Sequence, residues 1–449
     1  MVKKKRRLKK KVKIFLYLLL LFLVVGGVLL IFLGFNRKVI NESDNGNVSE
    51  IKKVDTDLLI SEIVGYDIGV EKAFLEAIYA DYGVDVLVEL NEILENNQYD
   101  DNIWHELTGN SLLVLNDTYN GIVGNSDNIS IAKSVNNTVS FVGDVSLADD
   151  WYIIPKYEER GKGVYGILSE EVVSIMKESD VMVANNEFTI SNRGSKMANK
   201  YYTFRASPER ISIYEEMGVD LVTLANNHIF DYGEDAFLDA LDYLKEYDMP
   251  YIGAGRNLDE ASKPYYFVVN GYKVAFVNAT RAEKFILTPG AGESTPGVFR
   301  CYDPTNFINT ISEVKKNSDY VVALVHWGRE DSTVLEDVQV ETSKLYIEAG
   351  ADLIVGTHAH TLQGIDFYNG KAIIYNLGDF IFNHETKDTA IFQLKINDDG
   401  SFEYYFIPCR QDNMYTYLLE DDEKLKVINN IRNLSNNITL EDSGKFYSE

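Results

Sequence analysis

Short apolar runs and amphipathic stretches alternate along most of this chain. From residue 138 onward, apolar runs of the length of buried strands lie at 138–142, 180–184, 219–225, 320–325 and 353–355. Between them, apolar residues recur every three or four positions and predict helices at 169–178, 207–217, 234–247, 305–316 and 336–349. Strands and helices in alternation are typical of a layered α/β domain, which we expect here.

Turn signals predict hairpins in the same part of the chain. Asn270-Gly271 and Asn369-Gly370 are dipeptides favoured in two-residue hairpin turns. Asp399-Gly400 separates two further strand-like runs, and an amphipathic helix is expected at 421–434. We therefore expect residues 385–449 to complete the domain that occupies 138–384.

The first 137 residues have a different pattern. Residues 1–13 hold nine Lys and Arg residues and no acid, and residues 14–35 are apolar and uncharged. A run of that length crosses the roughly 30 Å hydrocarbon layer as a helix. Residues 36–55 are polar and predict a flexible stalk, and residues 56–137 predict a small acidic helical segment with a linker.

The basic residues before the apolar run predict its orientation. Such residues stay in the cytoplasm, so we expect a single-pass protein of the cell membrane with the bulk of its chain outside. A cleaved signal peptide is the alternative. The run is longer than the roughly 7 to 15 residues of a signal-peptide core, and no Ala-x-Ala cleavage site follows, so we favour an uncleaved anchor.

Composition narrows the classes of partner. The net charge is −26 although the first 13 residues are basic, and such an acidic chain should repel nucleic acid. The 45% hydrophobic content is enough for a sizeable core. Only Cys301 and Cys409 are present, which excludes a disulfide framework and leaves either one bridge or two unpaired thiols.

Polar residues follow the ends of the expected strands. Ligands of open α/β sheets bind beyond the carboxyl ends of the strands, so these residues are candidates for a site. One strand ends in Asn226-Asn227-His228, with Asp231 just beyond, and another runs into His358-x-His360. The strand-end residues to which we assign a role are Asp144, Asn185, Glu187, Asn227, His228, Asp231, His326, Glu330, His358 and His360, and the last strand ends in Asn376-Leu377-Gly378-Asp379.

Carboxylate, amide and imidazole groups together form a ligand set suited to Zn, Mn or Fe. We expect one or two divalent ions, with one carboxylate able to bridge them. Two metals about 3.5 to 4 Å apart activate water and hold both the attacking and the leaving oxygen of a displacement. His228 is the candidate proton donor to the leaving group, because imidazole titrates near neutral pH. The alternative is a set of hydrogen-bonded polar caps at the sheet ends.

The strand-end motifs resemble, in their order, those of the capsule-synthesis protein CapA family, which is similar to the calcineurin-like metallophosphoesterases. The motifs are Gly143-Asp144, Asn185-x-Glu187, Asn226-Asn227-His228-x-x-Asp231-x-Gly233, His326-Trp327-Gly328-x-Glu330, Gly356-x-His358-x-His360 and Asn376-x-Gly378-Asp379-Phe380. The resemblance covers residues 138–384. It implies a four-layer sandwich of two mixed β-sheets flanked by helices, with metals at the sheet edge, and a membrane-anchored role in synthesis or export of a capsular polymer such as poly-γ-glutamate in bacteria.

The resemblance also implies roles for individual residues. His228 matches the proton donor, and we expect His228 and Asp231 to be the catalytic residues. Glu187 stands where the broader phosphoesterases place a bridging Asp. Their first motif is Asp-x-His, whereas this chain has Ser146 at the His position, so one ligand is missing or replaced. The residues that match metal ligands are Asp144, Glu187, Asn227, His326, His358 and His360.

Three residues are candidates for substrate binding: Arg205, Asn185 and Glu330. The planar fork of Arg205 suits an anionic substrate, although an arginine before a helix can equally pair with a surface acid.

We therefore expect an extracytoplasmic metal-dependent hydrolase of phosphoesterase type that acts on a capsular polyanion or phosphoester. Membrane subunits of a capsule synthase are possible partners. Ser146 leaves open a non-catalytic assembly or polymer-binding subunit with a degenerate metal site. A third possibility is an amide hydrolase or transferase acting on γ-glutamyl links, because metal-activated water also attacks an acyl centre.

Overall fold

The computed structural model describes residues 56–66, 75, 84–96, 103, 107, 128–132, 135–282 and 287–449. Among these residues, no helix is both long and apolar enough to cross a membrane. The expected anchor at 14–35 and the stalk at 36–55 lie outside the described residues.

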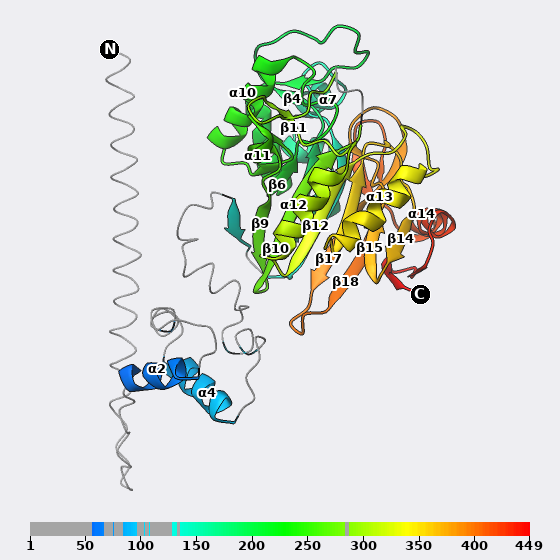
Figure 1. Cartoon of the computed structure of the whole chain (residues 1–449). Coiled ribbons are helices and arrows are strands. Elements are labelled where there is room, and N and C mark those ends of the chain that lie inside the picture. Colours follow the sequence, from blue (N-terminus) through cyan, green and yellow to red (C-terminus); the bar gives the residue numbers. More distant parts are fainter. Residues whose placement is uncertain are drawn as a thin grey trace, which may run out of the picture. The chain divides into compact units, whose positions relative to one another are not determined.

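Two mixed β-sheets form the centre of the domain (Figure 1). Within the described residues, the first sheet has seven strands in the order β1-β9-β10-β12-β13-β15-β14. The pairs β9/β10 and β14/β15 are antiparallel and the others are parallel. Its strands are β1 (Ile129–Ile131), β9 (Tyr265–Val269), β10 (Tyr272–Thr280), β12 (Tyr320–His326), β13 (Leu353–Thr357), β14 (Ile365–Tyr368) and β15 (Lys371–Ile374).

The second sheet has ten strands in the described part of the chain, with the main order β20-β21-β18-β17-β2-β3-β6-β7. The strand β16 pairs with β2, and β19 pairs with β18. The C-terminal strands join through β17, which runs antiparallel to β2. The strands of this sheet are β2 (Thr138–Val145), β3 (Val181–Asn186), β6 (Leu221–Thr223), β7 (Tyr251–Ile252), β16 (Asp379–Ile381), β17 (Lys387–Ile396), β18 (Phe402–Gln411), β19 (Thr416–Leu418), β20 (Ile438–Leu440) and β21 (Lys445–Ser448).

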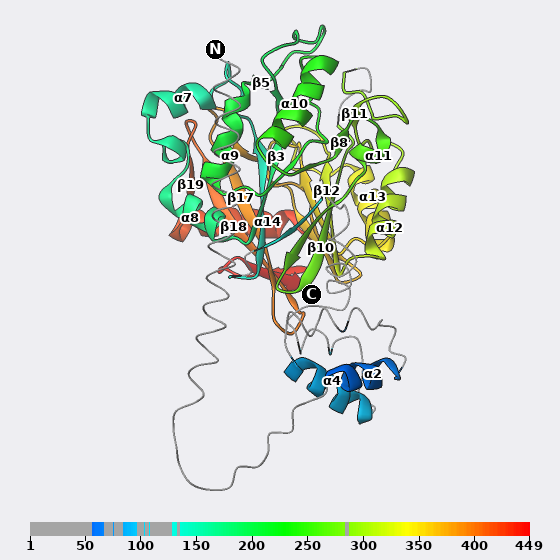
Figure 2. The same ribbon diagram turned by 90° about the vertical axis from the view of Figure 1, so that its left-hand side faces the viewer.

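Helices cover the outer faces of the two sheets, and Figure 2 shows α8 and α9 on one side of the strands and α12 and α13 on the other. Between the sheets lies an apolar layer to which both contribute, with Phe141 of β2 and Phe276 of β10 at a ring-centroid distance of 6.3 Å. The helices are α7 (Ile153–Arg160), α8 (Glu170–Glu178), α9 (Ile211–Met217), α10 (Glu234–Glu246), α11 (Leu258–Ala261), α12 (Thr305–Lys315), α13 (Asp337–Glu348) and α14 (Asp421–Leu434), with 3₁₀ turns η2 (Gly163–Gly166) and η3 (Pro208–Arg210).

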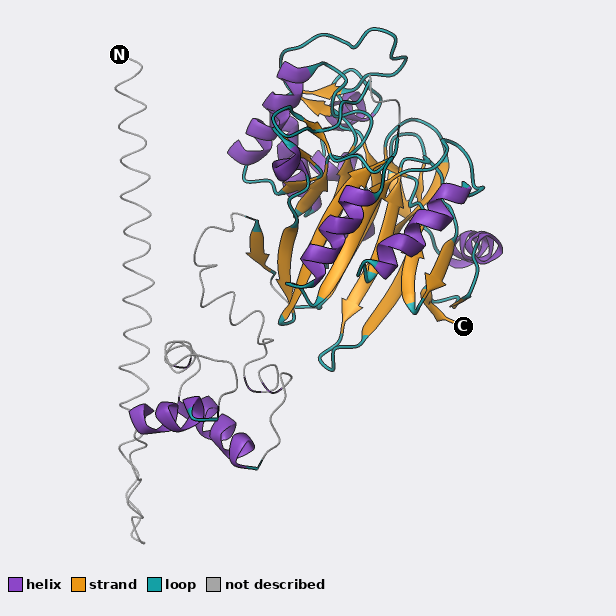
Figure 3. Cartoon of the chain, viewed as in Figure 1, coloured by secondary structure: helices purple, strands orange, loops and turns teal. Residues whose placement is uncertain are grey.

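Two short strand pairs lie outside the large sheets. They are β4 (Thr189–Ile190) with β5 (Arg205–Ala206), and β8 (Ala254–Gly255) with β11 (Gly297–Val298). Loops gather at one end of the sandwich, as the teal segments of Figure 3 show.

The expected α/β sandwich of two mixed sheets with flanking helices is confirmed. Both Asn-Gly hairpins form as expected, with positive φ at both turn residues: 51° and 76° at Asn270 and Gly271, 50° and 74° at Asn369 and Gly370. The helix expected at 421–434 is α14.

Some elements differ from the sequence patterns. The strand expected at 219–225 is shorter and spans Leu221–Thr223. The Leu224 amide still donates to Ile252 O of the neighbouring strand, whereas the Ala225 amide donates to the side-chain Oδ1 of Asn278, which ends the backbone pairing. The strand β1 lies within the expected linker, and α7 gave no recognised signal. Cys301 and Cys409 are buried, unpaired thiols in different apolar clusters.

Within 56–137, two helices pack against each other. They are α2 (Thr56–Val64) and α4 (Val84–Glu95). Leu59, Ile60 and Ile63 of α2 share a small apolar cluster with Leu87 and Leu90 of α4.

Candidate metal centre

Parallel pairing in both sheets brings strand-end residues together. In the second sheet Asp144 of β2 lies in register with Asn185 of β3, and in the first sheet His326 of β12 lies in register with Thr357 of β13. The turn after β13 carries His358 and His360. The end of each strand thus delivers polar side chains to one region, where Asp144, Glu187, His326, His358, His360 and Asp379 contribute to three overlapping groups of candidate metal ligands.

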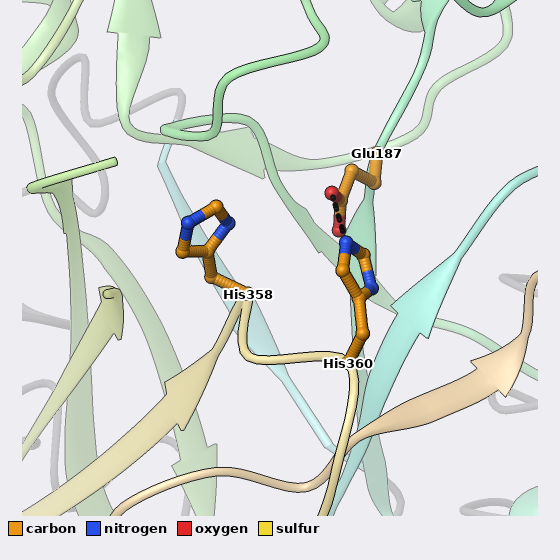
Figure 4. Close-up of side chains that lie close together, drawn as sticks. All are labelled: Glu187, His358 and His360. Carbon is orange, nitrogen blue, oxygen red and sulfur yellow. Dashed lines mark ion pairs between the residues drawn. The ribbon is translucent and has the colours of Figure 1, made fainter. Parts of the chain in front are cut away.

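Glu187 lies at the centre of this region. Its side chain is fully buried, and its Oε1 atom makes no hydrogen bond to any described residue. That oxygen lies 3.7 Å from His360 Nε2, 3.8 Å from His228 Nε2 and 3.9 Å from His326 Nε2. Figure 4 shows Glu187 beside His360, with His358 on the same turn as His360. All three distances exceed hydrogen-bond length, so the oxygen faces three imidazole nitrogens without bonding to any of them.

Asn227 and His326 form a second contact pair in the site. His326 Nε2 and Asn227 Oδ1 are 2.7 Å apart, and the other ring nitrogen of His326 lies 2.9 Å from Thr357 Oγ1. A hydrogen-bonded second ring nitrogen fixes the orientation of an imidazole, as it does for metal-ligating histidines.

Asn185 holds the two carboxylates of the second sheet in place. Its Nδ2 atom donates to Asp144 Oδ1 at 2.8 Å and to Glu187 Oε2 at 3.1 Å. Its Oδ1 atom accepts from Thr223 Oγ1 and Asn226 Nδ2. Asn185 is only 2% exposed, and its amide connects the two carboxylates to the segment of Thr223 and Asn226.

The turn that carries the two histidines has an unusual backbone. His358 has φ of 94° and His360 has φ of 52°, a region that non-glycine residues rarely adopt. The His358 amide donates to Asp144 Oδ2 at 3.1 Å, while its buried Nδ1 atom has no hydrogen-bond partner among the described residues. Such strain is found mostly at functional sites, where surrounding contacts maintain it.

His228 and Asp231 form a dyad beside the ligand set. His228 Nδ1 lies 2.7 Å from Asp231 Oδ2, which also accepts from the Phe204 amide at 2.7 Å. Lys200, whose side chain is 4% exposed, pairs with Asp231 Oδ1 at 2.7 Å and donates to the carbonyl oxygen of Asn227. His228 Nε2 therefore faces Glu187, while Lys200 pairs with the other carboxylate oxygen of Asp231.

The protonation states reflect burial and mutual charge. Burial lowers the pKa of His228, His326 and His358, so all three favour the neutral form that binds metals. Burial also acts to lower the pKa of His360, but the carboxylates of Asp379 and Asp144 raise it to about 9. Burial, followed by the charge of Asp144, raises the pKa of Glu187 well above its usual range.

These residues fit a divalent metal. A buried oxygen and a buried imidazole nitrogen without hydrogen bonds are costly in a protein interior unless an ion or water completes them. Buried carboxylates are stabilised by cations. Among the described residues, Glu187 forms ion pairs with histidines only. The ligand types, carboxylate oxygen and imidazole nitrogen, suit Zn, Mn or Fe.

The remaining expected residues lie at the margins of this cluster. Arg205 donates to the carbonyl oxygens of Arg193 and Gly194, and its guanidinium stacks over Tyr232 at 4.2 Å from the ring centroid. Glu330 is exposed, although its charge contributes to the raised pKa of Glu187 and His360. Neither residue is among the candidate metal ligands of the described region.

Two residues of this region were given no role from the sequence. Asp379 belongs to a recognised motif, but nothing in the motif indicated that β16 would pair with β2 and bring its carboxylate beside Asp144. Lys200 comes from an irregular segment between β4 and β5, where no pattern signals a buried lysine. Both depend on tertiary contacts between distant segments.

Comparison with known proteins identifies the family of this chain. Residues 138–384 match the family described as bacterial capsule synthesis protein PGA_cap. The chain is 34% identical over 273 residues to the PGA biosynthesis protein CapA of Bacillus subtilis (strain 168), covering 59% of this chain and 70% of that protein. It is 32% identical over 276 residues to the capsule biosynthesis protein CapA of Bacillus anthracis, covering 59% of this chain and 65% of that protein.

A solved structure described as a putative 5'-nucleotidase from Staphylococcus aureus aligns with 66% of this chain and 57% of its own, at 16% identity and a TM-score of 0.39. That similarity is too low to define the fold, which rests on the sheet topology above. The family match spans more than half of the chain and contains every strand-end motif of the metal centre. The chain therefore belongs to the bacterial capsule synthesis protein family.

Proposed function

We propose that this chain is a membrane-anchored, extracytoplasmic metal-dependent hydrolase of phosphoesterase type that acts in the synthesis or export of a capsular polymer like poly-γ-glutamate. The observation that carries the enzymatic part is Glu187 Oε1, which is buried, makes no hydrogen bond to described residues and lies within 3.9 Å of three imidazole nitrogens. The names of the relatives support the part about the capsule.

The metal ligands in this proposal come from both sheets. They are Asp144, Glu187, Asn227, His326, His358 and His360. When bound, a divalent metal lowers the pKa of a water molecule and polarises a phosphoryl oxygen. Asn185 positions the carboxylates of Asp144 and Glu187 through its amide nitrogen.

His228 is the proton carrier in this proposal. Its Nδ1 atom is held by Asp231, so Nε2 is the nitrogen that exchanges a proton with the leaving group. Phe204 and Phe382 pack beside the histidines, with ring-centroid distances of 4.4 Å to His228 and 4.7 Å to His360. These rings give the two histidines apolar neighbours.

The test uses the full chain, purified in mild detergent and loaded with Mn²⁺. We expect hydrolysis of bis(p-nitrophenyl) phosphate, and a fall in kcat of about 100-fold or more for His228→Gln with metal content unchanged. The matched control is His384→Gln, which changes an exposed histidine outside the ligand groups and should keep wild-type turnover. Metal-loaded wild type that turns over neither this diester nor related esters would overturn the enzymatic proposal.

The second candidate function is a non-catalytic subunit that binds polymer or a membrane partner through the metal centre. Ser146 favours it, because its buried Oγ atom has no hydrogen-bond partner among the described residues and stands where the broader phosphoesterases have a ligand. Under this alternative, His228→Gln leaves capsule formation intact in cells. Under the hydrolase proposal, the same variant abolishes it.

A further inference from the structure

The strand β16 places an additional carboxylate next to the metal centre. It runs parallel to β2, and Asp379 lies in register with Asp144. Both side chains are fully buried. Since neighbouring strands in a sheet lie about 4.8 Å apart, this register holds the two acids at one point of the sheet edge.

Asp379 contacts a histidine of the proposed ligand set. Its Oδ1 atom lies 2.7 Å from His360 Nδ1, and that nitrogen lies 3.4 Å from Asp144 Oδ2. Potential ligand atoms of Asp144, His360 and Asp379 all lie within 4.8 Å of one another. These three residues therefore form a compact donor set, and Glu187 adjoins this set at His360 Nε2.

The same strand runs beside Ser146. The Ser146 amide donates to the carbonyl oxygen of Ile381 at 2.8 Å, so β16 occupies the edge next to the position that lacks a ligand side chain. The Ser146 hydroxyl is too short to replace an imidazole as a strong donor. The acid on this adjacent strand is Asp379.

Charge points to a cation at this position. Asp144, Glu187 and Asp379 are three buried carboxylates in one cluster, and within the described residues the first two form ion pairs with histidines only. Asp379 also pairs with Lys387 at 3.4 Å. Independently, the buried Glu187 Oε1 atom has no hydrogen bond and faces His360 Nε2. A divalent cation would stabilise this group of buried acids.

We propose that Asp379 is a ligand of a second divalent ion, together with Asp144 and His360, and that it supplies the donor that Ser146 does not. Glu187 Oε1 lies 3.7 Å from His360 Nε2 of this donor set and 3.9 Å from His326 Nε2 of the set made by Asn227, His326 and His358, so its carboxylate would serve both ions. The inference rests on the proposed metal-dependent function and adds to it the count of ions and the identity of one ligand.

The competing role for Asp379 is to orient His360 without touching an ion. The two roles separate in Asp379→Asn. The amide oxygen still accepts a hydrogen bond from His360 Nδ1, so orientation is kept, whereas the neutral amide is a far weaker ligand than the carboxylate. The matched control is Asp388→Asn, which removes a carboxylate nine residues further on that pairs with Arg410 and makes no contact with His360.

The experiment measures Mn²⁺ content and its electron paramagnetic resonance spectrum in the full chain. We expect two ions per wild-type chain with a spin-coupled signal, and the same for Asp388→Asn. Asp379→Asn should keep one ion, give an uncoupled six-line signal and bind the second ion more than about 100-fold more weakly. An Asp379→Asn variant that holds two ions at wild-type affinity, or a folded one that holds none, would overturn the proposal.

A second variant keeps the test decisive if Asp379→Asn does not fold. Lys387→Met removes an ammonium group 3.4 Å from Asp379 Oδ2 and should tighten the second ion by at least about threefold while leaving the first unchanged. Equal affinities for the second ion in Lys387→Met and wild type would contradict the role of Asp379.

The stoichiometry of the wild type separates this inference from the proposed function. A wild-type chain that binds one ion and hydrolyses the diester overturns the second site and leaves the proposed function in place. A chain that binds no ion overturns both.

Discussion

Acidic residues lie at both ends of the parallel strands, but their partners differ between the two ends. At the amino ends, an aspartate directly precedes each of four strands and accepts a hydrogen bond from a backbone amide of the neighbouring strand. These pairs are Asp180 with Thr138, Asp220 with Met182, Asp319 with Lys273 and Asp352 with Val321, at 2.7–2.9 Å. These acids are satisfied by the backbone, and Asp352 also by two lysines.

At the carboxyl ends, acids face histidines and one another. Glu187 Oε1 has no hydrogen bond among described residues, and the pKa values of Asp144 and Glu187 are raised, first by burial. An acid at a strand end is therefore not informative by itself. The hydrogen-bond and ion-pair partners of the acid indicate whether it stabilises the sheet or is available to bind a ligand.

The largest expected effect comes from the centre of the carboxyl-end cluster. Glu187→Gln should weaken metal binding by more than about 100-fold, because it removes a charged ligand rather than an outer partner of one. Isothermal titration with Mn²⁺ measures this, with the exposed Glu341→Gln as control. Metal affinity within threefold of wild type would show that Glu187 is another buried structural acid.

Metal binding at the carboxyl-end cluster should stabilise the folded protein. At a free metal concentration of 100 times Kd, a site present only in the folded state adds about 2.7 kcal/mol to the free energy of unfolding. Denaturant unfolding with Mn²⁺ and with a chelator measures the difference. It should vanish in Glu187→Gln and persist in Asp352→Asn, and the reverse pattern would contradict the division between the two ends.

Substitution of an acid at the amino ends of the strands should change the free energy of unfolding but not metal binding. Asp352 is 4% exposed and accepts from the Val321 amide and from the ammonium groups of Lys315 and Lys371. Asp352→Asn should lower the free energy of unfolding by about 2 kcal/mol, since part of this network loses its acceptor. Metal stoichiometry should stay at the wild-type value, and loss of metal would show that the two ends are coupled.

The smallest expected effect concerns Arg205, at the margin of the carboxyl end. Its guanidinium contacts two carbonyl oxygens and the Tyr232 ring, so Arg205→Ala should cost about 1 kcal/mol in the free energy of unfolding. Metal affinity and KM for a diester should change by less than about threefold. A large rise in KM alone would instead support the expected role of Arg205 in holding an anionic substrate.

The sequence was most informative where a local pattern determines a local structure. The alternation of apolar runs and amphipathic stretches predicts a layered α/β domain, and the family resemblance implies its sandwich of two mixed sheets. The Asn-Gly dipeptides predict both hairpins, because their residues adopt the required positive φ. Strand-end polarity indicated the region where the candidate ligands meet, since parallel strands end at one edge.

The remainder depends on contacts between distant segments. Nothing near Lys200 indicates that its ammonium group would be buried against Asp231, 31 residues later. The pairing of β16 with β2 joins segments more than 200 residues apart, so the place of Asp379 beside Asp144 could not be read from either motif. The anchor expected at 14–35 stays a prediction, because it lies outside the described residues.

The most direct test of the metal centre is an anomalous-difference map from crystals of the chain grown with Mn²⁺. Two peaks are expected, about 3.5 to 4 Å apart, with Glu187 within bonding distance of both. One peak should lie against His358 and His326, and the other against His360 and Asp379. A map without a peak at Glu187, from crystals in which the two sheets are as described, would contradict the account.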